Sequence, residues 1–188
     1  MSYITTATGK HFDPINPEEE LLDINDIAHS LSFICRANGH IKHFYSVAQH
    51  SIACAKEATA RGYERDIILF CLLHDASEAY LSDVTRPIKK DLPYYLDTEE
   101  RLQNLIWKHF EGRIPNGDDR KLIFEIDDQM LSKEFHELMP EDIDDSYLKL
   151  VSDVRCEERR PEEVREEFVS MFGEYLESLY EVLFHVSP

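Results

Sequence analysis

Apolar residues recur three and four positions apart along most of the chain, a spacing typical of amphipathic helices rather than strands. The pattern predicts helices over residues 26–37, 46–61, 64–80, 97–112 and 118–138, and a last helix from residue 161 onward. Outside the N-terminal arm, residues 1–25, no stretch alternates convincingly over five positions. We therefore expect an all-α fold, preceded by an arm that is irregular or forms a short hairpin.

Several polar and special residues mark where these helices should begin and end. Ser46 is a plausible N-cap for the second helix, and Asp97 with Glu100 has capping-box spacing at the start of the fourth. Gly112 would close that fourth helix. Pro161 is favoured in the first turn of the last helix, whose apolar positions continue to Leu183.

The length of 188 residues predicts a single domain with ample apolar content for a core. We divide it into the N-terminal arm (1–25), a helical core (26–139), and an acidic linker with a C-terminal helix that packs on the core (140–188). The apolar stripe of the last helix suits a subunit interface as readily as the core.

A formal net charge of −18 restricts the partners. A field of that sign repels nucleic-acid backbones and anionic lipid, so we expect neither a nucleic-acid polymer nor a membrane as partner. A small anionic substrate requires a metal ion and basic side chains that reverse the field locally. The N-terminal residues lack the apolar segment of a signal peptide, and the four cysteines show no CxxC spacing, which predicts a reducing, cytoplasmic location. Cys54 and Cys71, among apolar neighbours, are interpreted as small hydrophobes.

The pair His74-Asp75 ends the apolar run 67–73 and is the strongest chemical signal in the chain. Two ionisable groups at such a position are costly unless something compensates them, and a divalent cation does so well. His50 upstream and Asp127 downstream complete a set of four ligands. Each alone is more often a core histidine or a solvated acid, and only their joint occurrence favours a metal site.

Asp127 is preferred to its neighbour Asp128 as the fourth ligand. Adjacent residues on a helix point about 100° apart, so only one of the two can face the histidines. Leu131 and Glu134 repeat the face of Asp127 and suggest an inward-facing stripe.

Two further carboxylates are candidates for acid–base work. Glu78 lies four residues after His74 and shares its face if the helix continues. Asp83 approaches from a loop ahead of Pro87. A hydrolase needs such groups to orient a water molecule and to supply a proton to the leaving oxygen.

Basic residues are scarce, so their positions carry weight. Arg36 could hold a phosphate in a bidentate contact, and Arg86 with Lys89 could form a phosphate-binding rim. Ordinary solubilising charge is the competing interpretation of the latter pair. His40 follows Gly39 in a turn and either lines the pocket or is a simple loop histidine.

These residues resemble the HD-domain superfamily of metal-dependent phosphohydrolases, and most closely its group of bacterial 5′-deoxynucleotidases and phage deoxynucleoside triphosphohydrolases. The likeness covers roughly residues 9–136. It rests on Val47-Ala48-Gln49-His50-Ser51, on His74-Asp75-Ala76-Ser77-Glu78 followed by Asp83, and on Ile126-Asp127 with Leu131 and Glu134.

The resemblance implies that His50, His74, Asp75 and Asp127 bind one divalent ion. Two imidazoles and two carboxylates suit Mn, Co, Zn, Fe or Ni. It also implies an HD-type helical bundle, assembly into a dimer or higher homo-oligomer, catalytic roles for Glu78 and Asp83, and a phosphate or sugar contact for Arg36.

We therefore expect a phosphohydrolase that acts on nucleotides, 5′-nucleotidase-like, through a metal-activated water. A deoxynucleoside triphosphate hydrolase of the same fold remains open, because the 86–90 segment favours more than one phosphate. Two other classes remain: a metal- and nucleotide-binding module without turnover, and a purely structural helical protein.

Overall fold

The computed structural model describes residues 3–140 and 149–184, with side chains up to residue 176 in the last helix. The all-α prediction is confirmed: helices dominate, beside one small sheet. In chain order the elements are β1 (Ile4–Thr5), β2 (His11–Phe12), the 3₁₀ turn η1 (Glu19–Leu21), α1 (Ile24–Phe33), the 3₁₀ turn η2 (Arg36–Gly39), α2 (Val47–Ala60), α3 (Arg65–Leu73), α4 (Glu78–Leu81), α5 (Arg86–Lys89), α6 (Pro93–Glu111), α7 (Gly117–Leu138) and α8 (Pro161–Phe184).

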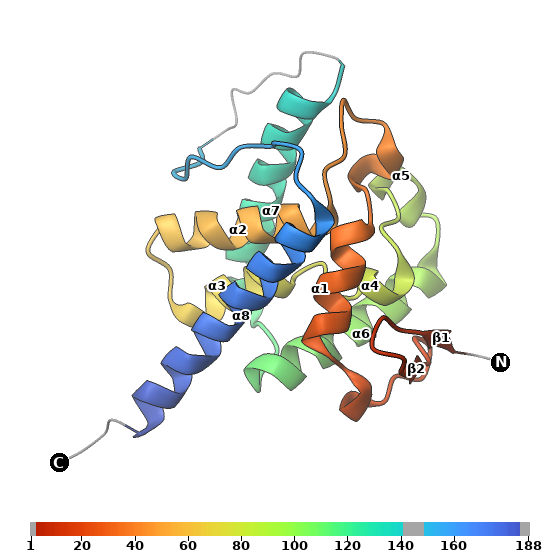
Figure 1. The fold of residues 1–188 in the computed structure, drawn as a ribbon, viewed down its shortest axis with the longest axis vertical. Coiled ribbons are helices and arrows are strands. Elements are labelled where there is room, and N and C mark those ends of the chain that lie inside the picture. Colours follow the sequence, from red (N-terminus) through yellow and green to blue (C-terminus); the bar gives the residue numbers. More distant parts are fainter. Residues whose placement is uncertain (1–2, 141–148, 185–188) are drawn as a thin grey trace.

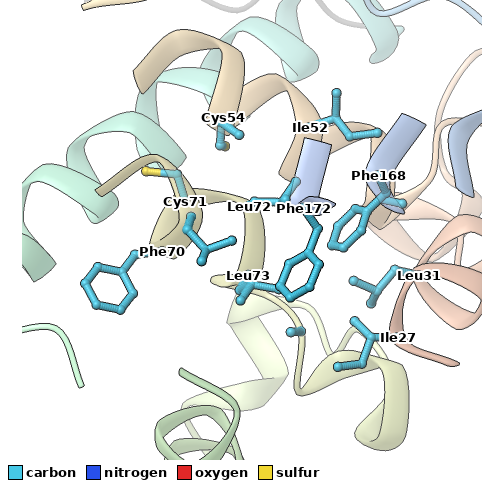
Figure 2. Close-up of a cluster of buried hydrophobic side chains, with 14 of the residues drawn as sticks. Ile27, Leu31, Ile52, Cys54, Phe70, Cys71, Leu72, Leu73, Phe168 and Phe172 are labelled. Atoms are coloured by element: carbon cyan, nitrogen blue, oxygen red, sulfur yellow. The ribbon is translucent and has the colours of Figure 1, made fainter. Parts of the chain in front are cut away.

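The core forms around α3, where every residue from 67 to 73 is buried. Helix α2 packs along α3, and α8 lies across α1, α2 and α3 (Figure 1). Figure 2 shows how α1 and α8 contribute to this core, because Leu31 and Phe168 face the leucines of α3. Such a cluster fixes the relative positions of the helices that carry the polar site.

The stripe on α8 that suited either an interface or the core packs inward where its side chains are described. Val164, Phe168 and Phe172 all belong to the buried core. The predicted apolar positions Leu179, Tyr180 and Leu183 lie outside the described side chains. The first part of the last helix therefore stabilises the bundle itself.

The N-terminal arm is an ordered hairpin rather than an irregular segment. Strands β1 and β2 pair antiparallel, with Ile4 opposite Phe12. Both carboxylate oxygens of Asp26 in α1 accept hydrogen bonds from Thr8, each at 2.7 Å. The fully buried Phe12 stacks on Tyr80 of α4. The arm is thereby attached to the helices beside the site.

The predicted starts of α2 and α8 are confirmed, whereas that of α6 is wrong. Ser46 and Gln49 form a reciprocal capping box at the start of α2. Helix α6 begins at Pro93, before Asp97, because proline with its fixed φ is favoured in the first turn. Asp97 lies inside this helix and pairs with Arg101. Gly112 ends it in the left-handed conformation, as predicted.

The helix predicted over 64–80 is also corrected, because α3 ends at Leu73. Residues 74–77 form turns, and a new short helix, α4, begins at Glu78. His74 still has helical dihedral angles, with φ −63° and ψ −30°, and its Nε2 lies 3.4 Å from Asp75 Oδ2.

Helix α1 ends at Phe33, four residues earlier than the pattern predicts. The backbone then becomes extended, and Cys35 pairs with Ser46 in an isolated antiparallel β-bridge. The amide of Arg36 donates to the carbonyl of Tyr45 at 2.9 Å, so tertiary pairing replaces the last helical turn. Ala37 and Asn38 follow with left-handed φ values of 52° each. This tight turn holds Arg36 beside the site.

Among the described residues, none of the helices is both long enough and apolar enough to cross a bilayer.

Candidate metal centre and its cavity

Four side chains predicted as ligands converge at one point, from α2, the turn after α3, and α7. His50 Nε2 lies 3.2 Å from His74 Nε2 and 3.1 Å from Asp127 Oδ1. Asp75 Oδ2 lies 3.4 Å from His74 Nε2 and 3.8 Å from His50 Nε2. Asp127 Oδ1 lies 3.8 Å from His74 Nε2. Residues far apart in the sequence thus place their donor atoms within one coordination sphere.

The other nitrogen of each imidazole is already engaged, which fixes the direction of the free lone pair. His50 Nδ1 donates to Glu134 Oε1 at 2.7 Å, and His74 Nδ1 donates to the carbonyl of Cys71 at 2.7 Å. With hydrogen on Nδ1, a neutral imidazole presents Nε2 as an acceptor. Metal-ligating histidines characteristically have such an oriented outer nitrogen.

Two imidazole lone pairs and two carboxylate oxygens therefore face one another. Four acceptors at this spacing repel unless a proton or a cation lies between them. A divalent ion with ligand distances near 2.1 Å and angles of about 90–120° separates its donor atoms by about 3.0–3.6 Å. The observed separations of 3.1–3.8 Å fit such an ion closely.

The electrostatics of the cluster agree with this chemistry. Burial by itself raises the pKa of Asp127, but in the absence of an ion a second proton on Nε2 of His50 or His74 lets these rings donate to Asp127, and this holds its pKa far below its usual range. Burial opposes ionisation of Asp75 in the same way, yet the histidines and Arg36 keep its pKa low. Both carboxylates are thus ionised and ready to bind a cation.

Cys54 belongs to the same cluster, and the sequence interpretation missed it. Its Sγ lies 3.7 Å from His50 Nε2. His50, Cys54 and His74 each offer a ligand atom within 4.8 Å of the others, a grouping compatible with a bound metal ion. The signal in the sequence was the spacing of four from His50, which places both side chains on one face of α2.

Glu134 is the second residue whose role the sequence did not give. The pattern placed it on the inward face of α7, and the structure shows it almost fully buried, joined to His50 and to Arg36. It lies 84 residues from His50 in the chain, so no local spacing connects the two.

A cavity of about 1160 Å³ opens beside the cluster. Helices α6 and α7 form much of its wall, and His74, Asp75 and Asp127 lie on its surface. Its volume is slightly larger than the range of about 300–1,000 Å³ that is usual for small-molecule sites. Other wall residues from these helices are Leu96, Glu99, Gln103, Asn104, Trp107, Arg120, Phe124, Leu131 and Phe135.

Both candidate acid–base carboxylates line this cavity. Glu78 is nearly fully buried, and its Oε2 has no hydrogen-bond partner among the described residues. Burial, reinforced by the negative charges of Asp75 and Asp83, raises its pKa well above the usual value. Burial likewise raises the pKa of Asp83. Two carboxyls beside the cluster therefore hold protons more readily than ordinary surface acids.

Three of the four predicted substrate contacts line the cavity, but each already has carboxylate partners. Arg36 reaches Asp75 at 3.4 Å and Glu134 at 3.3 Å. Lys89 pairs with Glu99 at 2.6 Å and more distantly with Glu78. Arg86 bridges Asp127 and Asp128. His40 is exposed and is not part of the cavity wall.

The preference for Asp127 over Asp128 agrees with the positions of the two side chains. Asp127 faces the histidines, whereas the side chain of Asp128 is 63% exposed and meets Arg86. The fold and the site together define a helical protein with a buried cluster of histidine, cysteine and carboxylate groups that is compatible with a metal ion.

No family model matches the chain. It is 45% identical over 108 residues to the uncharacterized protein YfdR of Escherichia coli K12. The aligned region covers 56% of this chain and 57% of YfdR. It is 35% identical over 109 residues to the uncharacterized protein RCAP_rcc00048 of Rhodobacter capsulatus, covering 55% of each. The chain thus spans about half the length of these curated relatives.

Proposed function

We propose that this chain is a metal-dependent phosphohydrolase of the HD-domain type that acts on nucleotides, in the manner of a 5′-nucleotidase. The observation that carries the proposal is the convergence of His50, His74, Asp75 and Asp127 at the edge of a large cavity. Those four residues, in that order, are also the ones that the resemblance assigns to the ion.

When bound, the divalent ion lowers the pKa of a water molecule towards neutrality and screens phosphate charge. The chain itself supplies the orientation. Glu134 and the Cys71 carbonyl hold the two imidazoles in place, and the buried ligands keep bulk water away from one side of the cluster. The partly exposed Asp75 and Asp127 mark the side that a substrate approaches.

Glu78 is the group best suited to deliver a proton to the leaving oxygen. Its raised pKa favours the acid form relative to an ordinary glutamate, and its Oε2, which has no hydrogen-bond partner among the described residues, is the atom to donate. Asp83, which is less buried than Glu78 and also lines the cavity, suits the positioning of the attacking water. Lys89 lies 3.5 Å from Glu78 Oε1 and stabilises the carboxylate that remains after proton transfer.

Arg36 is the main candidate for the phosphate contact. A guanidinium has five donors, and its contacts with Asp75 and Glu134 use only two of them. Arg36 also lines the cavity. Because acidic residues surround the site, a phosphate enters favourably only with the ion and Arg36 opposing their charge.

The far part of the cavity has the size and chemistry for a nucleoside. Arg120 and Asp127 are seven residues apart on α7, so they are separated by about 10 Å along the helix axis. That span matches a phosphate held at the ion with its base towards Phe124 and Asn104. Phe124 offers an aromatic face that is 52% exposed.

The pairing of the cations favours a monophosphate over a triphosphate. Lys89 and Arg86, which would hold the additional phosphates, already meet carboxylates at 2.6–2.8 Å. Arg36 alone suffices for one phosphate. A binding module without turnover has no use for a buried Glu78 whose Oε2 has no hydrogen-bond partner among the described residues, so catalysis is the better explanation of that residue.

The test is to supply deoxynucleoside mono- and triphosphates to protein loaded with Mn²⁺, Co²⁺, Zn²⁺ or Mg²⁺ and to identify the products. The proposal predicts release of inorganic phosphate from monophosphates. Release of inorganic triphosphate from the deoxynucleoside triphosphates instead would assign the chain to the triphosphohydrolases. No product with any metal, in protein shown to contain one, would leave the binding module as the function.

A further inference from the structure

Cys54 belongs to the cluster, but neither the sequence pattern nor the proposed mechanism assigns it a chemical role. It lies one turn after His50 on α2 and is fully buried. Figure 2 shows it at the edge of the hydrophobic core, near Cys71. The position of its sulfur relative to the two imidazoles gives it a second interpretation besides packing.

The distances place the sulfur where a ligand atom belongs. Metal–nitrogen and metal–sulfur bonds of about 2.1 and 2.3 Å, at angles of about 90–120°, separate the two atoms by about 3.1–3.8 Å. The Sγ of Cys54 lies 3.7 Å from His50 Nε2 and within 4.8 Å of the ligand atom of His74. The separation of 3.7 Å between the sulfur and His50 Nε2 falls within that range.

The arrangement also leaves the cavity side of the ion open. Cys54 and His50 are completely buried, whereas Asp75 and Asp127 are partly exposed and line the cavity or its edge. A sulfur ligand would therefore occupy the face of the ion turned towards the core. Substrate and water would still reach the opposite face.

We propose that Cys54 is a ligand of the metal site, contributing a thiolate beside the imidazoles of His50 and His74. The proposal rests on the metal centre of the proposed function. Binding replaces the thiol proton with the ion, and that proton leaves to solvent. A soft sulfur ligand selects Zn²⁺, Co²⁺ or Fe²⁺ over the hard ions Mn²⁺ and Mg²⁺.

The buried environment explains why the thiol is inert without an ion. Burial raises the pKa of Cys54 to about 11, so the metal-free protein holds it as a neutral thiol at pH 7. Binding of a divalent cation deprotonates such a ligand outright. The same position that makes Cys54 a small hydrophobe in the metal-free protein makes it a sulfur ligand in the loaded one.

The test is the optical spectrum of the full chain loaded with Co²⁺. A cobalt–thiolate bond gives an intense near-ultraviolet charge-transfer band that nitrogen and oxygen ligands do not give. We expect this band in the wild type and in Cys71→Ala, a matched buried cysteine, and its loss in Cys54→Ala. The weaker visible bands of cobalt should persist in Cys54→Ala.

Metal competition gives a second readout. Loss of an outer partner of a metal ligand lowers affinity by about 10–100-fold, so loss of a ligand should lower Co²⁺ affinity by at least tenfold and Mn²⁺ affinity much less. Stoichiometric Co²⁺ without the band in the wild type would overturn the sulfur ligand and leave the proposed function intact. Absence of Co²⁺ binding in the wild type would overturn both.

Discussion

The carboxylate of Glu134 accepts a hydrogen bond of 2.7 Å from Nδ1 of His50, and both side chains are buried. This contact, between α7 and α2, directs the other ring nitrogen of His50 at Asp127 and His74. The orientation of the cluster therefore depends on a residue that is not itself a ligand.

Glu134→Gln should weaken metal binding without removing a ligand. An amide neither fixes the imidazole tautomer as firmly nor balances its charge, so we expect a loss of about 10–100-fold in metal affinity. Competition with a chelator measures it. Glu125→Gln, on the same helix but with a side chain 54% exposed, is the matched control. Equal affinities in both variants would show that Glu134 does not position His50.

Arg36→Lys should impair turnover more than folding. A lysine cannot maintain two contacts, to Asp75 and Glu134, and still present donors to a phosphate. We expect kcat/KM to fall on the order of a hundredfold, comparable to the loss of one preorganised donor.

Arg101→Lys, at an exposed ion pair with Asp97, serves as the control for the charge-conserving change. Steady-state kinetics with a deoxynucleoside monophosphate decides the matter. An Arg36→Lys enzyme as active as Arg101→Lys would remove Arg36 from the phosphate contact.

Phe124→Ala should raise KM and leave kcat nearly unchanged, because stacking on the base, which takes no part in the bond cleavage, contributes equally to the substrate complex and the transition state. Aromatic stacking on a base contributes about 1–3 kcal/mol, so a KM increase of roughly tenfold is expected. Ile114→Ala, another exposed apolar residue outside the cavity wall, is the control. A KM unchanged by Phe124→Ala would place the base elsewhere.

Glu57 should make the stability of the fold sensitive to acid. It is fully buried and accepts hydrogen bonds from the amides of Val151 and Ser152, the hydroxyl of Ser152, and Arg61. Burial alone raises its pKa, but these donors outweigh burial and hold the pKa below its usual value of 4.5. The charged form is therefore the one that stabilises the native state.

The sign follows from linkage. Because the pKa is lower in the folded state, the stabilisation is fully present above the unfolded pKa and is lost as pH falls through the folded one. Glu57→Gln should lower the free energy of unfolding by about 2–3 kcal/mol at pH 7, and by progressively less below about pH 4.5. Urea denaturation across this range measures the difference. A difference that stays constant with pH would contradict this assignment.

Local signals in the sequence identified the elements that depend on local physics. Ser46 and Pro161 mark helix starts because capping and a fixed φ act within a few residues. The prediction that α6 begins at Asp97 is wrong because the capping-box spacing of Asp97 and Glu100 also occurs inside a helix, and this helix has already begun at Pro93.

Features that depend on tertiary contacts could not be predicted from the sequence pattern. The extended pairing of Cys35 with Ser46 ended α1 early, and the turn after Leu73 replaced a predicted helical continuation. The sequence pointed to four donor residues that meet in the structure, but not to Glu134 or Cys54. Glu134 meets His50 only through the packing of α7 on α2, and the spacing of four that puts Cys54 on the same face as His50 does not by itself show that its sulfur lies beside the imidazole.

The central claim is that the cluster of His50, His74, Asp75 and Asp127 holds an ion that drives phosphate release. The most direct measurement is phosphate release from deoxynucleoside monophosphates by wild type and Asp75→Asn, each with its metal content determined. Asp97→Asn, an exposed acid outside the cavity wall, is the control. We expect the wild type and Asp97→Asn to release phosphate, and a chelator to abolish this activity in both. Asp75→Asn should release almost none. Equal phosphate release by Asp75→Asn would contradict the central claim.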